Sequence, residues 1–333
     1  MNIIIDGFGG DNAPLEVIKG SIQAIKNFDI EITVVGDQNK IKKCAKDNNI
    51  DISELKIKHA SDIIEISDNP TDILKSKADS SMSVGMKMLA NDEGDAFVSA
   101  GSTAALVVGG TFIVKRIKGV KRAALAPILP TSEGPFMIVD AGANSDCRPE
   151  MLQQWGIMGS AFMHKTMNIE NPRVALANIG TEETKGRELE LEAYKLLKVS
   201  PINFIGNVEA RELPAGATDV IVADGYVGNM LLKLYEGMGK FISRELKGML
   251  MTGFKSKLAA LLILKKVKAF RKKMDYSEYG GSPLLGTSKP VIKAHGSSNA
   301  KAFYNAIRQA YQFTEAGVIG DVEKALSDMK NKK

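Results

Sequence analysis

The stretch that decides the fold is Asn178-Ile-Gly-Thr-Glu-Glu-Thr-Lys-Gly186. It follows an apolar run at residues 173–179, typical of a buried strand, and precedes residues 185–198, where apolar side chains recur at helical spacing. The stretch therefore predicts a polar turn between a strand and a helix. Backbone N–H groups and the helix dipole at such a turn favour an anion, and Lys185 would add a positive charge. In another interpretation, Glu182 and its neighbouring glutamate simply cap the helix.

The same order of strand, polar turn and helix occurs three more times in the chain. In an open α/β sheet, such turns gather at the carboxyl ends of the strands, where ligands bind. Four turns of one polarity therefore predict a binding site at a sheet edge. The three further turns are Gly7-Phe-Gly-Gly-Asp11 after a strand at residues 2–6, residues 97–103 before a helix at residues 104–114, and Asp224-Gly-Tyr-Val-Gly-Asn229, with a helix beginning near Asn229.

Strand and helix candidates alternate along most of the chain, which is the pattern of an α/β protein. A long helix candidate at residues 151–167 follows the turn at residues 140–144, which offers a boundary between two halves. No linker rich in proline, serine or charge marks that turn, so we expect a single unit that spans residues 1–333. The remaining strand candidates are residues 31–35, 55–59, 123–129, 136–140 and 202–208.

The composition is that of an ordinary globular protein, with 44% hydrophobic and 25% charged residues. The formal charge of +5 is mild, and aromatic residues at 6% are too sparse for a base-stacking surface, so nucleic acid is not an expected partner. Cys44 and Cys147 lie far apart in the sequence and give neither a disulfide framework nor a metal-type pair, which fits a reducing cytosol. Residues 1–5 lack the features of a signal peptide, so secretion by that route is not expected.

The pattern changes after Asn229, because residues 230–274 show no strand signal and predict a helical hairpin. Its centre, residues 258–264, is almost wholly apolar and is flanked by lysines and arginines. The run is too short to span a bilayer, which needs about 20 apolar residues, but an apolar helix edge with a basic rim can lie on an anionic membrane surface. The alternative is burial against a second subunit, and a dimer that presents the tip of the hairpin would satisfy both. The residues assigned to membrane contact are Leu258, Leu261, Leu262, Leu264, Lys265 and Lys266.

The residue types that usually carry catalysis are scarce. His59, His164 and His295 are the only histidines, and none has metal-site spacing or accompanies a Gly-x-Ser-x-Gly elbow, so no metal centre is expected. Cys147 beside Arg148 suggests an activated thiol, although a cysteine packed in the core is the more common arrangement. The glycine turn near the N-terminus lacks the third glycine of the nicotinamide-binding pattern.

What remains is a site rich in backbone donors, lysine, asparagine and aspartate, without an evident covalent nucleophile. Such a site suits a reaction whose nucleophile arrives from solution. Inorganic phosphate is already an anion at neutral pH, so it needs to be held and aimed at a carbonyl more than deprotonated. A thioester is a natural target, because its thiolate leaves with little proton assistance and the developing oxyanion needs only a fixed donor or cation.

Eight short segments spread along the chain carry a specific signature. They are Asp6-Gly-Phe-Gly-Gly-Asp11 with Pro14, Ser99-Ala-Gly-Ser-Thr-Ala-Ala-Leu106, Asp140-Ala-Gly-Ala-Asn144, Asn178-Ile-Gly-Thr-Glu-Glu-Thr-Lys-Gly186, Gly206-Asn-Val-Glu209, Asp224-Gly-Tyr-Val-Gly-Asn229, Gly280-Gly-Ser-Pro-Leu-Leu-Gly286 and His295-Gly-Ser-Ser298. Together they resemble, almost end to end, the fatty acyl phosphate synthases, the acyl-acyl carrier protein:phosphate acyltransferases of bacterial phospholipid synthesis. The departures are Gly7 and Phe8 for the family's Ala-Met, Ser102 for Asn, Ala104 for Gly and Ser282 for Ala.

The resemblance implies transfer of a long-chain acyl group from acyl-acyl carrier protein to inorganic phosphate, which gives an acyl phosphate for phosphatidic acid synthesis. It implies a Rossmann-like three-layer α/β fold similar to that of the isocitrate and isopropylmalate dehydrogenases and the phosphotransacetylases. It also implies a cytoplasmic homodimer attached peripherally to the inner face of the cell membrane. Its product would serve a glycerol 3-phosphate acyltransferase, and no metal or other cofactor is expected.

Combining the turns with the resemblance assigns roles to individual residues. Lys185 and the turn at residues 178–182 would hold phosphate or polarise the thioester carbonyl. Asn229 would donate to the oxyanion, and Asp224 would orient Lys185 or accept a phosphate proton. His295 either takes part in catalysis or is a packed histidine that caps the next helix. The residues assigned to substrate binding are Gly9, Gly10, Asp11, Ser102, Thr103, Asn178, Gly180, Glu182, Gly225 and His295.

Two other functions stay open at this point. A coenzyme A-dependent phosphotransacetylase shares the fold and the phosphate chemistry but would not need the apolar run at residues 258–264. A non-enzymatic membrane scaffold for lipid synthesis would need that run but not Lys185 or the glycine turns. The basic residues Lys268, Arg271 and Lys272 can serve the lipid, steer the acidic carrier protein to the enzyme, or do both.

Overall fold

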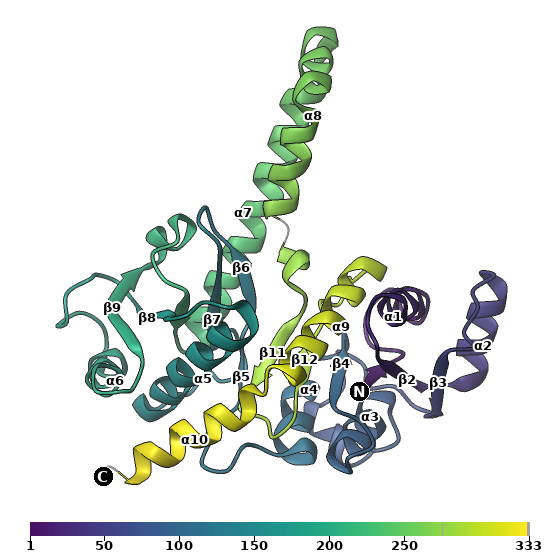
Figure 1. The fold of residues 1–333 in the computed structure, drawn as a ribbon, viewed down its shortest axis with the longest axis horizontal. Coiled ribbons are helices and arrows are strands. Elements are labelled where there is room, and N and C mark those ends of the chain that lie inside the picture. Colours follow the sequence, from purple (N-terminus) through teal and green to yellow (C-terminus); the bar gives the residue numbers. More distant parts are fainter. Residues whose placement is uncertain (275, 332–333) are drawn as a thin grey trace.

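The computed structural model describes residues 1–274 and 276–331, and its strands form two sheets (Figure 1). The larger sheet has the order β3 (Leu55–His59), β2 (Glu31–Gly36), β1 (Asn2–Asp6), β4 (Ala96–Ser99), β12 (Val291–Lys293), β11 (Ser282–Leu285) and β5 (Ala124–Leu125). The smaller sheet has the order β6 (Ile128–Pro130), β7 (Pro135–Val139), β10 (Val220–Val222), β8 (Arg173–Asn178) and β9 (Asn203–Glu209). In the larger sheet, the five neighbouring strands β3, β2, β1, β4 and β12 are parallel, and in the smaller sheet so are β7, β10, β8 and β9. The strands β11, β5 and β6 pair in the antiparallel sense. The expected α/β fold is confirmed.

Both faces of each sheet are covered by helices, which explains why the parallel strands read as continuous apolar runs. In β1, Ile3 and Ile5 pack on one side with α1 and α9, while Ile4 packs on the other side with α3 and α4. The smaller sheet lies between α5 and α7. The helices outside the hairpin are α1 (Leu15–Asn27), α2 (Gln38–Asp47), α3 (Ser81–Ala90), α4 (Thr103–Gly109), α5 (Pro149–Met167), α6 (Glu188–Lys198), α9 (Ala300–Glu315) and α10 (Val318–Asn331), with short helical turns η1 (Pro70–Leu74), η2 (Gly110–Val114), η3 (Ala210–Ala215) and η4 (Tyr276–Tyr279).

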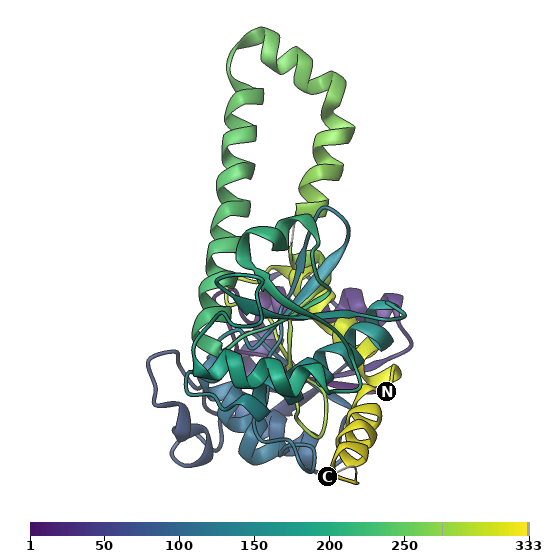
Figure 2. The ribbon, with the colours of Figure 1, turned by 90° about the vertical axis from the view of Figure 1, so that its left-hand side faces the viewer.

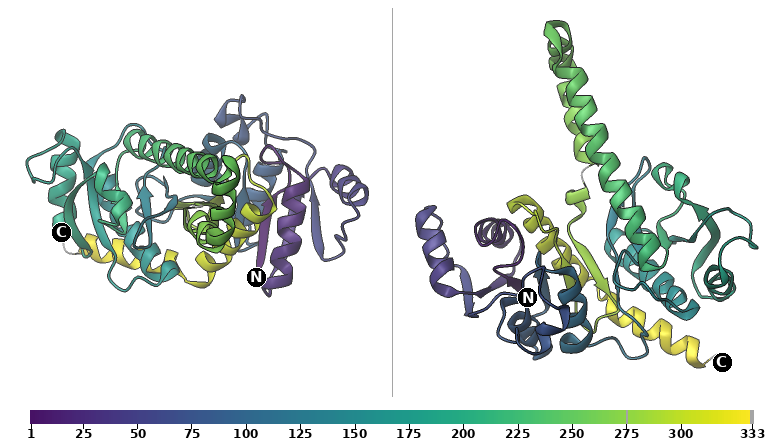
Figure 3. Two further views of the ribbon diagram at one scale, coloured as in Figure 1. Left: turned by 90° about the horizontal axis from the view of Figure 1, so that it is seen from above. Right: turned by 180° about the vertical axis from the view of Figure 1, so that it is seen from behind.

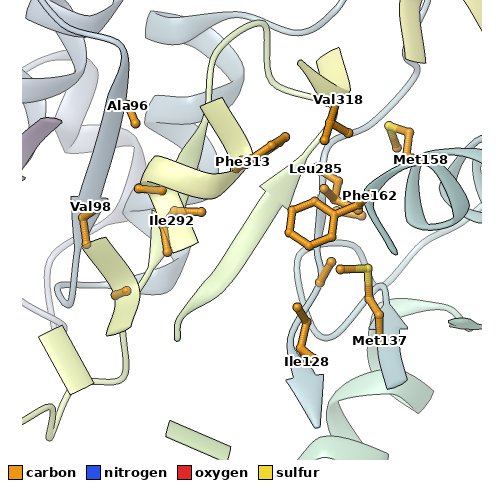
Figure 4. Close-up of a cluster of buried hydrophobic side chains, with 14 of the residues drawn as sticks. Ala96, Val98, Ile128, Met137, Met158, Phe162, Leu285, Ile292, Phe313 and Val318 are labelled. Atoms are coloured by element: carbon orange, nitrogen blue, oxygen red, sulfur yellow. The ribbon is translucent and has the colours of Figure 1, made fainter. Parts of the chain in front are cut away.

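One cluster of buried side chains joins the two sheets (Figure 4). Phe162 of α5 meets Phe313 of α9 edge to face, with ring centroids 5.1 Å apart. Leu285 of β11 and Val318 of α10 lie beside this pair, and Met137 of β7 lies on the side of the smaller sheet. Aromatic pairs of this geometry stabilise a protein by about 0.5–1.5 kcal/mol beyond the contribution of their buried area. The contact therefore holds the two sheets against each other.

The element boundaries differ from the sequence-based expectation in a few places, each with a local cause. The run at residues 123–129 is not one strand but two, β5 and β6, in different sheets, because Pro127 lacks the N–H that a continuous ladder requires. The helix expected at residues 104–114 is α4 followed by the π-helical turn η2. Helix α6 begins at Glu188 rather than Lys185, because Gly186 has a φ of +105°.

A helical hairpin made of α7 (Gly225–Met251) and α8 (Gly253–Met274) projects from the body of the molecule (Figures 1 and 2). Seen from above, it stands over the junction between the two sheets (Figure 3). Helix α7 begins at Gly225, four residues before the expected start at Asn229, because Asp224 caps its first turn by accepting the Val227 N–H at 2.7 Å. No helix in residues 1–274 and 276–331 is long and apolar enough to cross a membrane.

The first turn of α7 lies against the loop after β7 with almost no spare room. A Cβ atom built on Gly228 would stand 1.8 Å from the Asp140 carbonyl oxygen, whereas one built on Gly237 of the same helix would meet nothing within 4 Å. We therefore expect Gly228→Ala to lower the free energy of unfolding by about 1–3 kcal/mol or more. The matched variant Gly237→Ala should raise it by up to about 1 kcal/mol, since alanine favours a helix. Equal melting temperatures for the two variants would contradict the close contact.

Candidate active site

Three turns meet at the carboxyl ends of β1, β4 and β12, which are neighbours in the larger sheet. Gly10, with a φ of +94°, lies in the first turn, and a Cβ there would stand 2.8 Å from the Gly296 carbonyl oxygen and 2.9 Å from the Ala100 Cβ. The Asp11 N–H donates to the Gly296 carbonyl at 2.8 Å. A residue larger than glycine at position 10 would therefore separate the three turns.

The Asp6 carboxylate holds two of these turns together from inside the core. The hydroxyls of Ser81 and Ser99 each donate to it at 2.6 Å, and the Phe8 N–H donates at 3.2 Å. Ser99 in turn accepts the Gly101 N–H at 3.0 Å. Complete burial raises the pKa of Asp6 above its usual range, although these hydrogen bonds oppose the shift.

Lys293 ends β12 directly beneath the same turns. Its side-chain ammonium donates to the carbonyl oxygens of Ala100, at 3.2 Å, and Ala294. Burial lowers the pKa of Lys293 to about 8, while the charges of Asp6 and Asp11 oppose that shift. A lysine with this pKa in a cleft wall is a candidate for function.

A cleft of about 610 Å³ lies between the two sheets, with the three turns at one end. Its wall is apolar along α4 and the segment from β5 to β6, and polar along α7 and the turn after β12. In the polar part, Lys233 pairs with the largely buried Glu236 at 3.1 Å, and partial burial lowers the pKa of His295. The lining residues are Pro70, Thr103, Ala104, Val107, Val108, Leu125, Pro127, Ile128, Leu129, Ala141, Gly142, Ala143, Asn229, Leu232, Lys233, Glu236, Gly280, Gly281, Ser282, Lys293, Ala294, His295 and Gly296.

Three of the residues assigned to catalysis or substrate binding line this cleft: Thr103, Asn229 and His295. The Nδ1 atom of His295 lies 2.9 Å from the Ser297 hydroxyl oxygen, within its own turn. Gly9 and Gly10 pack behind the cleft against the turns at Gly101 and Gly296, and the Ser102 hydroxyl caps α4 by accepting the Ala105 N–H at 3.4 Å. The structure thus brings together the turns from the larger sheet.

The turn from Asn178 to Gly186 lies at the end of β8 and does not line the cleft. The Asn178 side chain donates to the Lys185 carbonyl at 2.9 Å, and the Asn207 side chain donates to the Glu182 carbonyl at 2.8 Å. Gly180 is buried in this turn, and the Lys185 side chain is exposed. The interpretation of Glu182 and Glu183 as helix caps is wrong, because a capping box of Arg187 and Glu190 starts α6.

Asp224 has a different partner from the one expected. Its carboxylate forms an ion pair with Arg187, and no contact with Lys185 occurs within hydrogen-bond distance in the described part of the chain. The expected orientation of Lys185 by Asp224 is therefore not present here. The next residue, Gly225, donates its N–H to the Asn144 carbonyl at 2.8 Å, so this pair of residues anchors α7.

Sequence reasoning missed Lys293, Lys233 and Glu236. For Lys293, the signal was a lysine at the end of the short β-branched run Val291-Ile292, two residues before His295. For Lys233 and Glu236, it was their position four and seven residues after Asn229, which puts all three on one helix face.

The residues assigned to membrane contact lie in α8. Leu261, Leu262, Leu264, Lys265 and Lys266 are exposed. The side chain of Leu258 lies outside those that the structure describes, as does that of Arg271.

The two sheets with a cleft between them form an α/β fold that solved phosphotransacetylases share. A phosphotransacetylase from Streptococcus pyogenes superposes with a TM-score of 0.65 at 17% identity, covering 96% of this chain and 94% of that one. One from Staphylococcus aureus superposes with a TM-score of 0.63 at 16% identity, covering 95% and 94%. At this identity the likeness concerns the fold.

Sequence comparison is more specific. The family model described as fatty acid synthesis protein matches residues 1–320. A phosphate acyltransferase from Thermoanaerobacterium thermosaccharolyticum is 48% identical over 326 residues, covering 98% of this chain and 97% of the relative. One from Thermoanaerobacter pseudethanolicus is 47% identical over 330 residues, covering 99% and 98%. The chain belongs to the fatty acid synthesis protein family, and the expectation of an acyltransferase is confirmed.

Cys147 is not placed to act as a nucleophile. Its Sγ lies 3.4 Å from the Asn144 carbonyl oxygen, and burial raises the pKa of the thiol to about 11, so the reactive thiolate is scarce at neutral pH. We expect Cys147→Ser to keep a kcat/KM for acyl transfer close to that of the parent chain. Loss of turnover in a variant that melts at the parent temperature would contradict this expectation.

Proposed function

We propose that the chain transfers a long-chain acyl group from acyl-acyl carrier protein to inorganic phosphate in the cleft between the two sheets. The observation that carries this proposal is the division of the cleft, which has an apolar wall at Val107, Val108 and Ile128 and a polar end at Lys293 and His295. An acyl chain fits the first, and an anion fits the second. The acyl phosphate formed would be the donor for a glycerol 3-phosphate acyltransferase in phosphatidic acid synthesis.

The chemistry needs no covalent enzyme intermediate. Phosphate attacks the thioester carbonyl, and positioned donors at the polar end stabilise the oxyanion that develops. Asn229, which lines the cleft, is suited to donate to that oxyanion. The role given above to Lys185 stays a prediction, as do the acceptance of a phosphate proton by Asp224 and the assignment of the N-terminal glycine turn to phosphate.

We also propose that a second copy of the chain packs along α7. This helix carries exposed apolar side chains at Tyr226, Met230, Leu234, Met238 and Phe241. Spacings of three and four residues place them on one helix face, the arrangement that buries well against another helix. A homodimer through this stripe would leave the far end of the hairpin exposed.

The middle of α8 supports a separate proposal, contact with an anionic membrane surface. Leu261, Leu262, Ile263 and Leu264 are four consecutive exposed apolar residues, and Leu262 is 83% exposed. Since successive helical residues point in directions about 100° apart, this segment presents apolar side chains to solvent in several directions. Figure 2 shows that α8 leaves the end of α7 at an angle and bends partway along its length. The basic residues that follow, Lys265 to Lys272, would attract either the lipid or the acidic carrier protein.

The test of the function is to mix the purified chain with phosphate and either palmitoyl-acyl carrier protein or acetyl-coenzyme A, trapping acyl phosphate with hydroxylamine. We expect phosphate-dependent product from the carrier substrate. Product from the coenzyme A ester alone would make the chain a short-chain phosphotransacetylase, and no product from either would contradict the proposal.

The test of membrane contact is flotation with vesicles that contain phosphatidylglycerol. Each buried leucine contributes about 1.5–3 kcal/mol, so the double variant Leu261→Asp, Leu262→Asp should lower vesicle binding by about two orders of magnitude or more. Turnover of the carrier substrate in solution should stay unchanged. Val199→Asp is the matched control, because Val199 is 79% exposed at the end of α6, outside the hairpin. Equal flotation of both variants would exclude this segment as the contact.

A further inference from the structure

Lys293 combines burial, a positive charge and a position in the cleft wall. Lys293 is only 8% exposed, and its side chain lies where the turns after β4 and β12 meet. Two of its three N–H donors go to backbone carbonyls, those of Ala100 and Ala294. A lysine ammonium has three donors, so one remains for a ligand.

The charge of Lys293 is not cancelled by a direct ion pair. The Asp6 carboxylate has the largest acidic effect on Lys293. It accepts hydrogen bonds from Ser81, Ser99 and the Phe8 N–H, and it forms no salt bridge within the described residues. A buried cation held only by carbonyl dipoles is costly to keep, because burial removes its hydration. Such a group is expected where an anionic ligand arrives to complete its coordination.

We propose that Lys293 binds the attacking inorganic phosphate and holds it against the thioester carbonyl. This inference rests on the proposed function. Thr103, Asn229 and His295 line the same cleft, so a phosphate on Lys293 lies among polar groups and faces the apolar wall that takes the acyl chain. Lys293 is thereby a catalytic residue by contact with the nucleophile.

The step balances without any further reagent. An oxygen of hydrogen phosphate forms a bond to the carbonyl carbon, and the carbon–sulfur bond breaks with its electron pair leaving on the carrier thiolate. The proton of the hydrogen phosphate passes to that thiolate, which gives the free thiol and the acyl phosphate. Lys293 stays protonated throughout and serves as the fixed positive charge.

The proposal has a pH signature. The pKa of Lys293 is about 8, so its charge is present below that pH and is lost as the pH rises through it. The kcat/KM for phosphate should therefore fall across this range. The other titratable groups that face Lys293 are Asp6 from β1, Asp11 from the first turn, Lys233 and Glu236 from α7, and His295 from its own turn. Lys293→Arg keeps the charge at all these pH values. If the fall in kcat/KM at alkaline pH moves to a higher pH in this variant, the titration of residue 293 causes that fall.

The main test compares Lys293→Met with the control Lys289→Met, which removes a lysine four residues away that pairs with Asp92 outside the cleft. We expect Lys293→Met to lower the kcat/KM for phosphate by about two orders of magnitude, with little change in the KM for the acyl donor. A second readout is the rise in melting temperature that phosphate causes by binding the folded state. This rise should be lost in Lys293→Met and kept in Lys289→Met.

The inference is overturned if Lys293→Met keeps the parent kcat/KM for phosphate, or if it keeps the phosphate-dependent rise in melting temperature. An alkaline limb that stays in place in Lys293→Arg, with that variant folded and active, would also overturn it. These outcomes are separable from failure of the proposed function, because the melting experiment uses phosphate alone. A chain that makes no acyl phosphate from any donor but loses phosphate stabilisation in Lys293→Met would refute the reaction and keep the binding site.

Discussion

Two buried carboxylates at strand ends hold the cleft together, and the rest of the site depends on them. Asp6, at the end of β1, ties the turns of the larger sheet through two serine hydroxyls. Asp140, just after β7, does the same for the smaller sheet by accepting the N–H groups of Leu125, Ala143 and Asn144 at 2.7–3.2 Å. Burial raises the pKa of both carboxylates, and their hydrogen bonds offset part of that cost. The loops that border the cleft are therefore fixed from inside the core.

This arrangement explains why glycines cluster around the cleft. A carboxylate that gathers several N–H groups draws neighbouring backbones too close for side chains between them. Built Cβ atoms would stand 2.5 Å from the Asp6 carboxylate at Gly9 and 2.3 Å from the Asn144 carbonyl oxygen at Gly225. The glycines noticed in the sequence as phosphate-turn residues thus have a packing reason as well, and the two explanations are compatible.

The sequence predicted the parts of the fold whose signals are local and long enough. The strand at Leu55–His59 was predicted with its observed bounds, and the predicted start of α5 lies two residues after the observed one. Continuous apolar or periodic runs mark both elements in the sequence. The strands β11 and β12 were missed, because they are only four and three residues long, and a proline lies within β11 (Pro283) and directly before β12 (Pro290). Lys185 stood out in the sequence because it lies in a motif. Lys293 is notable only because it is buried. Its burial depends on the pairing of β4 with β12, which are almost two hundred residues apart in sequence.

The hairpin joins the cleft at both of its ends. Asn229, Leu232 and Lys233 lie in the first turns of α7, and Gly280 and Gly281 follow α8, and all of them line the cleft. Helix α7 is continuous from there to Met251. The 22 residue steps from Asn229 to Met251, at about 1.5 Å each, make a rigid spacer of about 33 Å. In the proposed function, an acyl phosphate made beside Asn229 would therefore start about 33 Å from the turn of the hairpin, and α7 would hold the cleft at that distance from anything the turn touches.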